Sequence, residues 1–75
     1  MSTMKNESIL KKFGAKAKLL RTQRKLSQER FASKTGLHWT YISGIERGKR
    51  NISILKLIQI AKALNINATE LMDFR

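Results

Sequence analysis

The chain has 75 residues and a formal net charge of +11 at pH 7, because sixteen Lys and Arg residues face five Asp and Glu residues. This length allows one small domain, and the absence of cysteine excludes disulfides and thiolate metal sites and fits a reducing cytoplasm. No apolar run is long enough to cross a membrane or serve as a secretory signal, and the basic charge favours a polyanionic partner over a surface charged only for solubility.

The N-terminal third is expected to form one long helix. Residues 1–7 have little apolar content and are expected to be frayed. Residues 8–24 are predicted to be helical, with Ser8 placed to cap the helix. Its apolar positions recur at helical spacing: Ile9, Phe13, Ala17 and Leu20. The remaining faces carry Lys11, Lys12, Lys16, Lys18 and Arg24, so one stripe of this helix is expected to face a core.

Two short helices are predicted next, over 28–35 and 39–47. Ser27 is a good N-cap for the first of them, because its hydroxyl can accept a hydrogen bond from a free N–H one turn on. Gly36 follows that helix and supplies a left-handed turn, a conformation that a Cβ atom disfavours. The sequence therefore predicts two helices joined by a tight turn.

The second of these helices carries a buried stripe on one side only. Ile42 and Ile45 form the stripe, and the opposite face is left free and is followed at once by Lys49 and Arg50. Two helices in this layout, in a strongly basic chain, are typical of a motif that places one helix in the DNA major groove. A helical hairpin with another role is the alternative.

The C-terminal third is predicted to hold two more helices. Residues 48–52 form a loop, Ser53 caps a helix over 54–64, Asn65 ends it, and a short helix covers 68–73. No segment alternates with period two for long enough to predict a strand. The expected fold class is all-α, with five helices in one compact domain.

Several motifs carry a family resemblance: FG at 13–14, LSQ at 26–28, A-x-x-x-G at 32–36, ISGIERGKRN at 42–51 and IAKAL at 60–64. With them the chain resembles the lambda-repressor-like (XRE-type) helix-turn-helix domains, which implies one such domain over 8–75, with the helix-turn-helix at about 28–47. The segment TYISGIERGKRN also resembles the controller proteins of bacterial restriction–modification systems. Those are small dimeric regulators of their own gene and the endonuclease gene, and they bind palindromic operators. The same segment occurs in phage-type repressors and stand-alone regulators.

The resemblance implies a set of DNA-binding residues in and around the second helix of the motif. They are Gln28, His38, Trp39, Thr40, Tyr41, Ser43, Arg47, Lys49, Arg50 and Asn51. Trp39 departs from the controller pattern, which often has arginine at this position. Its indole can cover a thymine methyl or stack on sugar, or else pack on the protein or on a partner subunit. The base preference of an arginine therefore cannot be transferred to this chain.

The resemblance also implies a structural ion pair between Arg21 and Glu46, which would hold the recognition helix against the first helix. Lys25 departs from the family, which often has glycine there to end that helix in a left-handed turn. A lysine at this position bears strain or forces another turn.

The last 24 residues carry more apolar side chains than one small core needs. An apolar patch left on the surface would indicate an interface, so a twofold homodimer is expected. The residues assigned to that interface are Leu55, Ile66, Leu71, Met72 and Phe74. The alternative is that these side chains only complete the core.

The expected partners are double-stranded DNA with a palindromic operator, a second copy of the chain and, if the protein activates, RNA polymerase. One His, five acidic residues and no cysteine leave no catalytic or metal-binding constellation, so neither an enzyme nor a cofactor is expected. The expected location is the nucleoid in the cytoplasm of a bacterial cell, with a bacterial or phage gene as the source. Three other readings remain open: a phage-type repressor, an antitoxin-like module that binds a protein, and a basic protein that coats nucleic acid without sequence preference.

Overall fold

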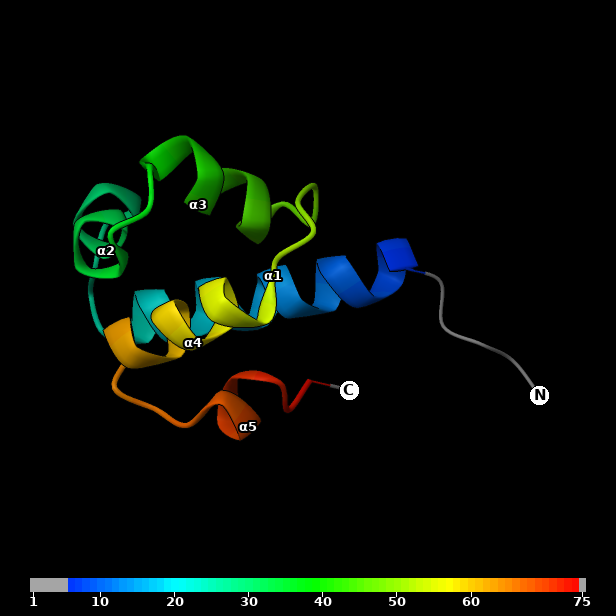
Figure 1. Ribbon diagram of the computed structural model, residues 1–75. Coiled ribbons are helices and arrows are strands. Elements are labelled where there is room, and N and C mark those ends of the chain that lie inside the picture. Colours follow the sequence, from blue (N-terminus) through cyan, green and yellow to red (C-terminus); the bar gives the residue numbers. More distant parts are fainter. Residues whose placement is uncertain (1–5, 75) are drawn as a thin grey trace.

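The computed structural model describes residues 6–74 and is helical, with no strand in that range. Its helices are α1 (Asn6–Gln23), α2 (Gln28–Thr35), α3 (Trp39–Glu46), α4 (Ile54–Ala63) and α5 (Ala68–Leu71) (Figure 1). The predicted all-α fold with five helices is confirmed, and predicted and observed helix ends differ by a residue or two, as is usual for frayed termini. Figure 1 shows α3 above α1 and α4, with α5 below α4.

The start of α1 differs from the prediction. The helix begins at Asn6, so Asn6 and Glu7 are helical although they were expected to be frayed, and the rest of that segment lies outside the described residues. Ser8 lies inside the first turn and is not the cap. Glu7 explains the longer helix in part, because a carboxylate in the first turn interacts favourably with the helix dipole.

The starts of α2 and α4 follow the predicted caps. Ser27 Oγ accepts from the Arg30 N–H at 3.1 Å, and Ser53 Oγ accepts from the Lys56 N–H at 3.2 Å. Gly36 has a φ of +78° and closes α2 through a hydrogen bond from its N–H to the Ala32 carbonyl. These contacts satisfy backbone groups that a helix end would otherwise leave free.

Lys25 lies in the left-handed region, with a φ of +56°. Its N–H donates to the Thr22 carbonyl at 2.9 Å, which closes the turn after α1. A residue with a Cβ atom is strained in this conformation by about 1 kcal/mol or more. The predicted strain at this departure from the family is therefore present.

The core lies between all five helices, since each of them or its C-terminal cap contributes buried side chains. Its fully buried large side chains are Phe31, Ile42, Ile45, Ile60, Leu64 and Leu71. α1 packs against α3 and α5, while α2 packs against α3 and α4. Gly14 permits the crossing of α1 with the end of α3, because a Cβ atom there would lie 2.8 Å from the Glu46 carbonyl oxygen and still closer to that of Ile45.

Within residues 6–74, none of the helices combines the length and the apolar character that a membrane span requires.

Candidate nucleic-acid interface

An ion pair fixes the end of α3 to α1. Arg21 donates from Nε to Glu46 Oε2 at 2.6 Å and from Nη2 to Glu46 Oε1 at 3.0 Å, in a bidentate arrangement. Its Nη1 donates to the Leu26 carbonyl at 2.7 Å, which ties the pair to the turn between α1 and α2. The two side chains are only 9% and 3% exposed. The structure thus brings together the two residues that the resemblance paired.

Gln28, at the start of α2, belongs to the same network. Its Nε2 donates to Glu46 Oε1 at 2.9 Å, and the residue is half-buried. An amide nitrogen has two hydrogens, so the second N–H is left for another acceptor such as a phosphate oxygen. The resemblance implied that Gln28 binds DNA, but it gave no sign of the bond from Gln28 to Glu46.

His38 caps α3, although serine, threonine or aspartate would be a better cap. Its Nδ1 accepts from the Thr40 N–H at 3.2 Å and lies 2.7 Å from Thr40 Oγ1. The imidazole also stacks on the Trp39 indole, with ring centroids 6.3 Å apart and planes at 26°. All three side chains are exposed, so the first turn of α3 presents an ordered cluster to solvent.

Gly44 lies beneath the side chain of Arg50. A Cβ atom on Gly44 would be 2.8 Å from Arg50 Cγ, so glycine lets this side chain lie across α3. The glycine in the middle of α3 therefore makes room for Arg50.

Tyr41 lies between two cations. The Arg50 guanidinium carbon is 5.3 Å from the centroid of the Tyr41 ring, and Lys56 Nζ is 5.6 Å from it. The Tyr41 hydroxyl donates to the Asn51 carbonyl at 3.4 Å. Cations over an aromatic face are attracted by the negative electrostatic potential of that face, so Tyr41 orders both. Sequence analysis did not assign Lys56 to this site. The one indication in the sequence is that Lys56 lies in the first turn of α4, directly after the basic loop.

The loop after α3 holds the remaining candidate residues. Gly48 has a φ of +73°, which turns the chain away from α3, and the Lys49 N–H donates to the Gly44 carbonyl at 2.9 Å. Arg47 Nε donates to the Ser43 carbonyl at 3.3 Å. Arg47, Lys49, Arg50 and Asn51 are exposed, whereas Ser43 and Tyr41 are half-buried. The predicted residues of α3 and its loop therefore form one basic surface beside the His38 cluster.

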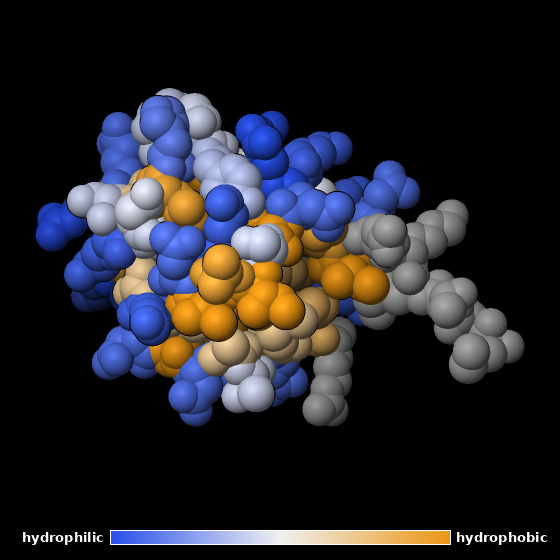
Figure 2. All heavy atoms as spheres, in the orientation of Figure 1, coloured by the Kyte–Doolittle hydropathy of each residue, from blue (hydrophilic) through white to orange (hydrophobic). Residues whose placement is uncertain are grey.

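A second surface is apolar and lies over α4 and the C-terminal turn. We call it the apolar face and define it by four exposed side chains: Ile54 (73%), Leu55 (74%), Ile58 (38%) and Met72 (47%). Figure 2 shows apolar side chains gathered in the middle of this view, with hydrophilic side chains along the top and left. Ile54 and Ile58 were not in the predicted interface.

The apolar face corrects one of the predicted interface residues. Leu71 is 0% exposed, because it points into the core, so it cannot contact a partner. Ile66 and Phe74 are half-buried and pack against the core, and Phe74 meets Phe13 edge to face at 6.2 Å. Among the five predicted residues, Leu55 and Met72 offer exposed apolar surface.

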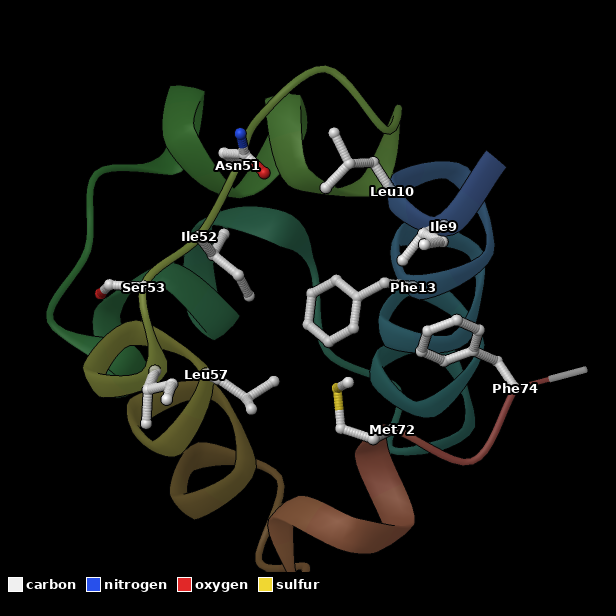
Figure 3. A pocket seen from close by; sticks show the side chains of 10 residues that line it. Ile9, Leu10, Phe13, Asn51, Ile52, Ser53, Leu57, Met72 and Phe74 are labelled. Carbon is white, nitrogen blue, oxygen red and sulfur yellow. The ribbon is translucent and has the colours of Figure 1, made fainter. Parts of the chain in front are cut away.

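A cavity of about 250 Å³ opens next to the apolar face. In Figure 3 the side chains of Phe13, Leu57 and Met72 point toward one another across it. Ile9 and Ile54 complete the rim from α1 and α4. No group of three His, Cys, Asp or Glu residues that could hold a metal ion is found among residues 6–74.

Comparison with known proteins assigns the family. Residues 18–71 match the helix-turn-helix family. The chain is 44% identical to control protein C.BamHI of Bacillus amyloliquefaciens over 63 residues, which are 83% of this chain and 78% of that protein. The chain therefore belongs to the helix-turn-helix family.

Solved structures that are similar to this chain include controller proteins of restriction–modification systems. The restriction–modification controller protein C.AhdI from Aeromonas hydrophila has a TM-score of 0.81 and 45% identity, over 83% of this chain and 94% of that chain. Controller protein C.Esp1396I was crystallised as a tetramer in complex with its natural 35 base-pair operator. Its structure has a TM-score of 0.80 and 37% identity to this chain, over 87% of this chain and 86% of that chain. The likeness to these control proteins extends over most of both chains.

Proposed function

We propose that this chain is a transcriptional regulator, the controller protein of a restriction–modification system, which binds a palindromic operator as a homodimer. It regulates its own gene and the endonuclease gene. The observation that carries the proposal is the basic surface on α3 and its loop, held rigidly to the core through Glu46 and Arg21. The similarity to C.Esp1396I, whose structure contains operator DNA, supports the same reading.

α3 enters the major groove in this proposal and reads base edges. Thr40 and Trp39 lie in its first turn and Ser43 lies one turn further along. Hydroxyl groups can donate to or accept from base edges, and apolar side chains contact thymine methyl groups. His38 and Tyr41 flank this reading surface, where the His38 ring and the Tyr41 hydroxyl are in reach of the DNA backbone.

The loop residues and the start of α2 bind phosphates. Arg47, Lys49 and Arg50 supply charge, Asn51 supplies an amide, and Gln28 offers its second amide N–H. We add Lys56, because Tyr41 holds it beside Arg50. Each phosphate that these cations neutralise makes the slope of log K against log salt more negative by about 0.9. Binding is therefore expected to weaken strongly as salt rises.

The apolar face joins two copies of the chain. Leaving Ile54 and Leu55 more than two-thirds exposed is unfavourable, since full burial of one such side chain stabilises by roughly 1.5–3 kcal/mol. Met72 and the half-buried Ile66 and Phe74 border the same contact. A twofold dimer sets its two recognition helices about 34 Å apart, which is one turn of DNA.

Regulation follows from occupancy of the operator. A bound dimer represses by blocking RNA polymerase, and activation requires a surface that touches the polymerase. The protein's own concentration then sets the degree of occupancy. Such a protein works at the nucleoid in the bacterial cytoplasm.

Footprinting on the DNA directly upstream of the chain's own gene tests the proposal. The experiment is run at physiological salt, with a scrambled duplex of the same composition as competitor. A protected palindrome with half-sites about one turn apart is expected. Uniform protection that the scrambled duplex abolishes would contradict the proposal and leave a basic helical domain without sequence preference.

A further inference from the structure

Trp39 is an exposed aromatic side chain at the first position of α3. It is 47% exposed, whereas Phe13 and Phe31 are buried and Tyr41 and Phe74 are half-buried. The apolar face, by contrast, is built from α4 and the C-terminal turn, and Trp39 is not one of its residues. Burial in the core and membership of that face therefore do not account for this indole.

The Trp39 ring is held in place before any ligand binds. It stacks on His38, and Nδ1 of that imidazole is in turn fixed by the N–H and the hydroxyl of Thr40, at 3.2 Å and 2.7 Å. Two short-range contacts thus position the imidazole, and the imidazole backs one face of the indole. A side chain ordered in advance loses less conformational entropy when it binds.

The hydrogen-bonding pattern of this cluster sets what it can recognise. His38 Nδ1 accepts from the Thr40 N–H and lies 2.7 Å from the Thr40 hydroxyl, so the polar edge of this imidazole that faces Thr40 is already engaged within the protein. The Thr40 side chain adds its own methyl group to the exposed cluster. The cluster carries no cation that could hold a guanine edge bidentately, and its largest exposed group is the apolar indole.

The major groove offers one apolar group that matches such a surface. Each base edge there presents polar donors and acceptors, and thymine adds a methyl group at C5. A cytosine methylated at C5 presents the same methyl group with a different exocyclic group beside it. An ordered indole in the first turn of a recognition helix fits a 5-methylpyrimidine better than an unmethylated base.

We propose that Trp39 contacts the 5-methyl group of a pyrimidine in each operator half-site and makes that methyl group a determinant of selectivity. The proposal rests on the proposed function, because it requires α3 to enter the major groove. Trp39 acts here as a specificity-determining residue, and His38 positions it.

The expected size of the effect follows from the burial of one methyl group. Removing it costs about 0.8 kcal/mol, which is about a fourfold loss of affinity for each half-site. A symmetric dimer that loses the methyl group in both half-sites is expected to bind about sixteenfold more weakly. Both changes are well within the range of a titration by fluorescence anisotropy.

The experiment starts by selecting duplexes from a pool of randomised DNA with the wild-type protein. In the enriched duplex, each thymidine of the half-site is replaced in turn, and symmetrically, by deoxyuridine, which lacks the methyl group. One symmetric position is expected to show the sixteenfold loss. At that position cytosine and 5-methylcytosine are then compared. Recovery with 5-methylcytosine assigns the contact to the methyl group of either base, and no recovery assigns it to thymine.

Two variants connect the effect to the indole. Trp39→Ala is expected to bind the deoxyuridine and thymidine duplexes equally at that position, and Trp39→Phe is expected to keep most of the difference. Both substitutions are at an exposed site, and thermal melting checks that the variants stay folded. Deoxyuridine sensitivity that persists unchanged in Trp39→Ala would overturn the proposal.

The outcomes separate this inference from the function on which it rests. An enriched palindrome whose thymidine and deoxyuridine duplexes bind the wild-type protein equally overturns the role of Trp39 and leaves the regulator intact. A pool with no enriched sequence contradicts the proposed function itself, and the role of Trp39 with it.

Discussion

Replacing Arg21 by methionine removes the cation that holds the recognition helix. Arg21 makes two hydrogen bonds to Glu46 and one to the Leu26 carbonyl. Without Arg21, the Glu46 carboxylate, whose side chain is 3% exposed, still accepts a hydrogen bond from the Gln28 amide but has lost its cation. Breaking a buried ion pair on one side costs about 3–5 kcal/mol, because the remaining charge stays buried without compensation.

That loss is large for a chain of this size. Domain stabilities run to about 0.05–0.15 kcal/mol per residue, so the loss is a substantial part of the total. With about 4 °C or more for each kcal/mol in a domain of this length, Arg21→Met is expected to lower the melting temperature by at least about 12 °C. Operator affinity is expected to fall as well, because Glu46 is the last residue of α3.

Circular dichroism melts at one fixed protein concentration measure the effect, since a dimer's melting temperature depends on concentration. Arg24→Met is the matched control, because Arg24 is an exposed arginine of the same region whose hydrogen bond goes to the Leu20 carbonyl, and it forms no ion pair within residues 6–74. It is expected to stay within about 0.5 kcal/mol of wild type. The double variant Arg21→Met/Glu46→Leu is expected to recover much of the loss. An Arg21→Met protein that melts with the wild type would refute the structural role of the pair.

Three further substitutions test the fold and the dimer. Gly14→Ala is expected to destabilise by about 1–3 kcal/mol in urea titration, because its Cβ meets the α3 backbone; unchanged stability would mean that α1 and α3 cross less closely. Lys25→Gly is expected to stabilise by roughly 0.5–1 kcal/mol by relieving the positive φ, and a loss would contradict that strain. Leu55→Glu is expected to give a folded monomer in analytical ultracentrifugation, since it puts a charge into the apolar face. A variant that still sediments as a dimer would place the interface elsewhere.

The helices and their boundaries are largely local properties, which is why the sequence predicts them. The caps at Ser27 and Ser53 and the left-handed turns at Gly36 and Lys25 depend on hydrogen bonds and dihedral angles among residues two to four positions apart. The spacing of the apolar residues also predicts which face of each helix is buried. Together with the net charge, these features also predict that the second helix of the motif, α3, is exposed and flanked by basic residues.

The predicted dimer surface was wrong at one residue, Leu71, because the position of this side chain depends on tertiary packing. Periodicity marks Leu71 as apolar, but it cannot tell whether an apolar side chain faces the core of its own chain or a neighbour. Its complete burial depends on how α5 folds back on α4 and α1, which is a matter of tertiary packing. Ile54 and Ile58 were missed as exposed residues for the same reason.

Only the tertiary structure decided which residues far apart along the chain contact one another. Gly44 makes room for Arg50, six residues away, and Tyr41 gathers Arg50 and Lys56 on its ring. Gln28 reaches Glu46 across 18 positions of the chain. The sequence by itself determined the helices, their caps and the basic residues that flank the recognition helix, because each of these depends on neighbours along the chain. The contacts of Arg50, Lys56 and Gln28 exist only once the helices have packed, because the partners meet through space.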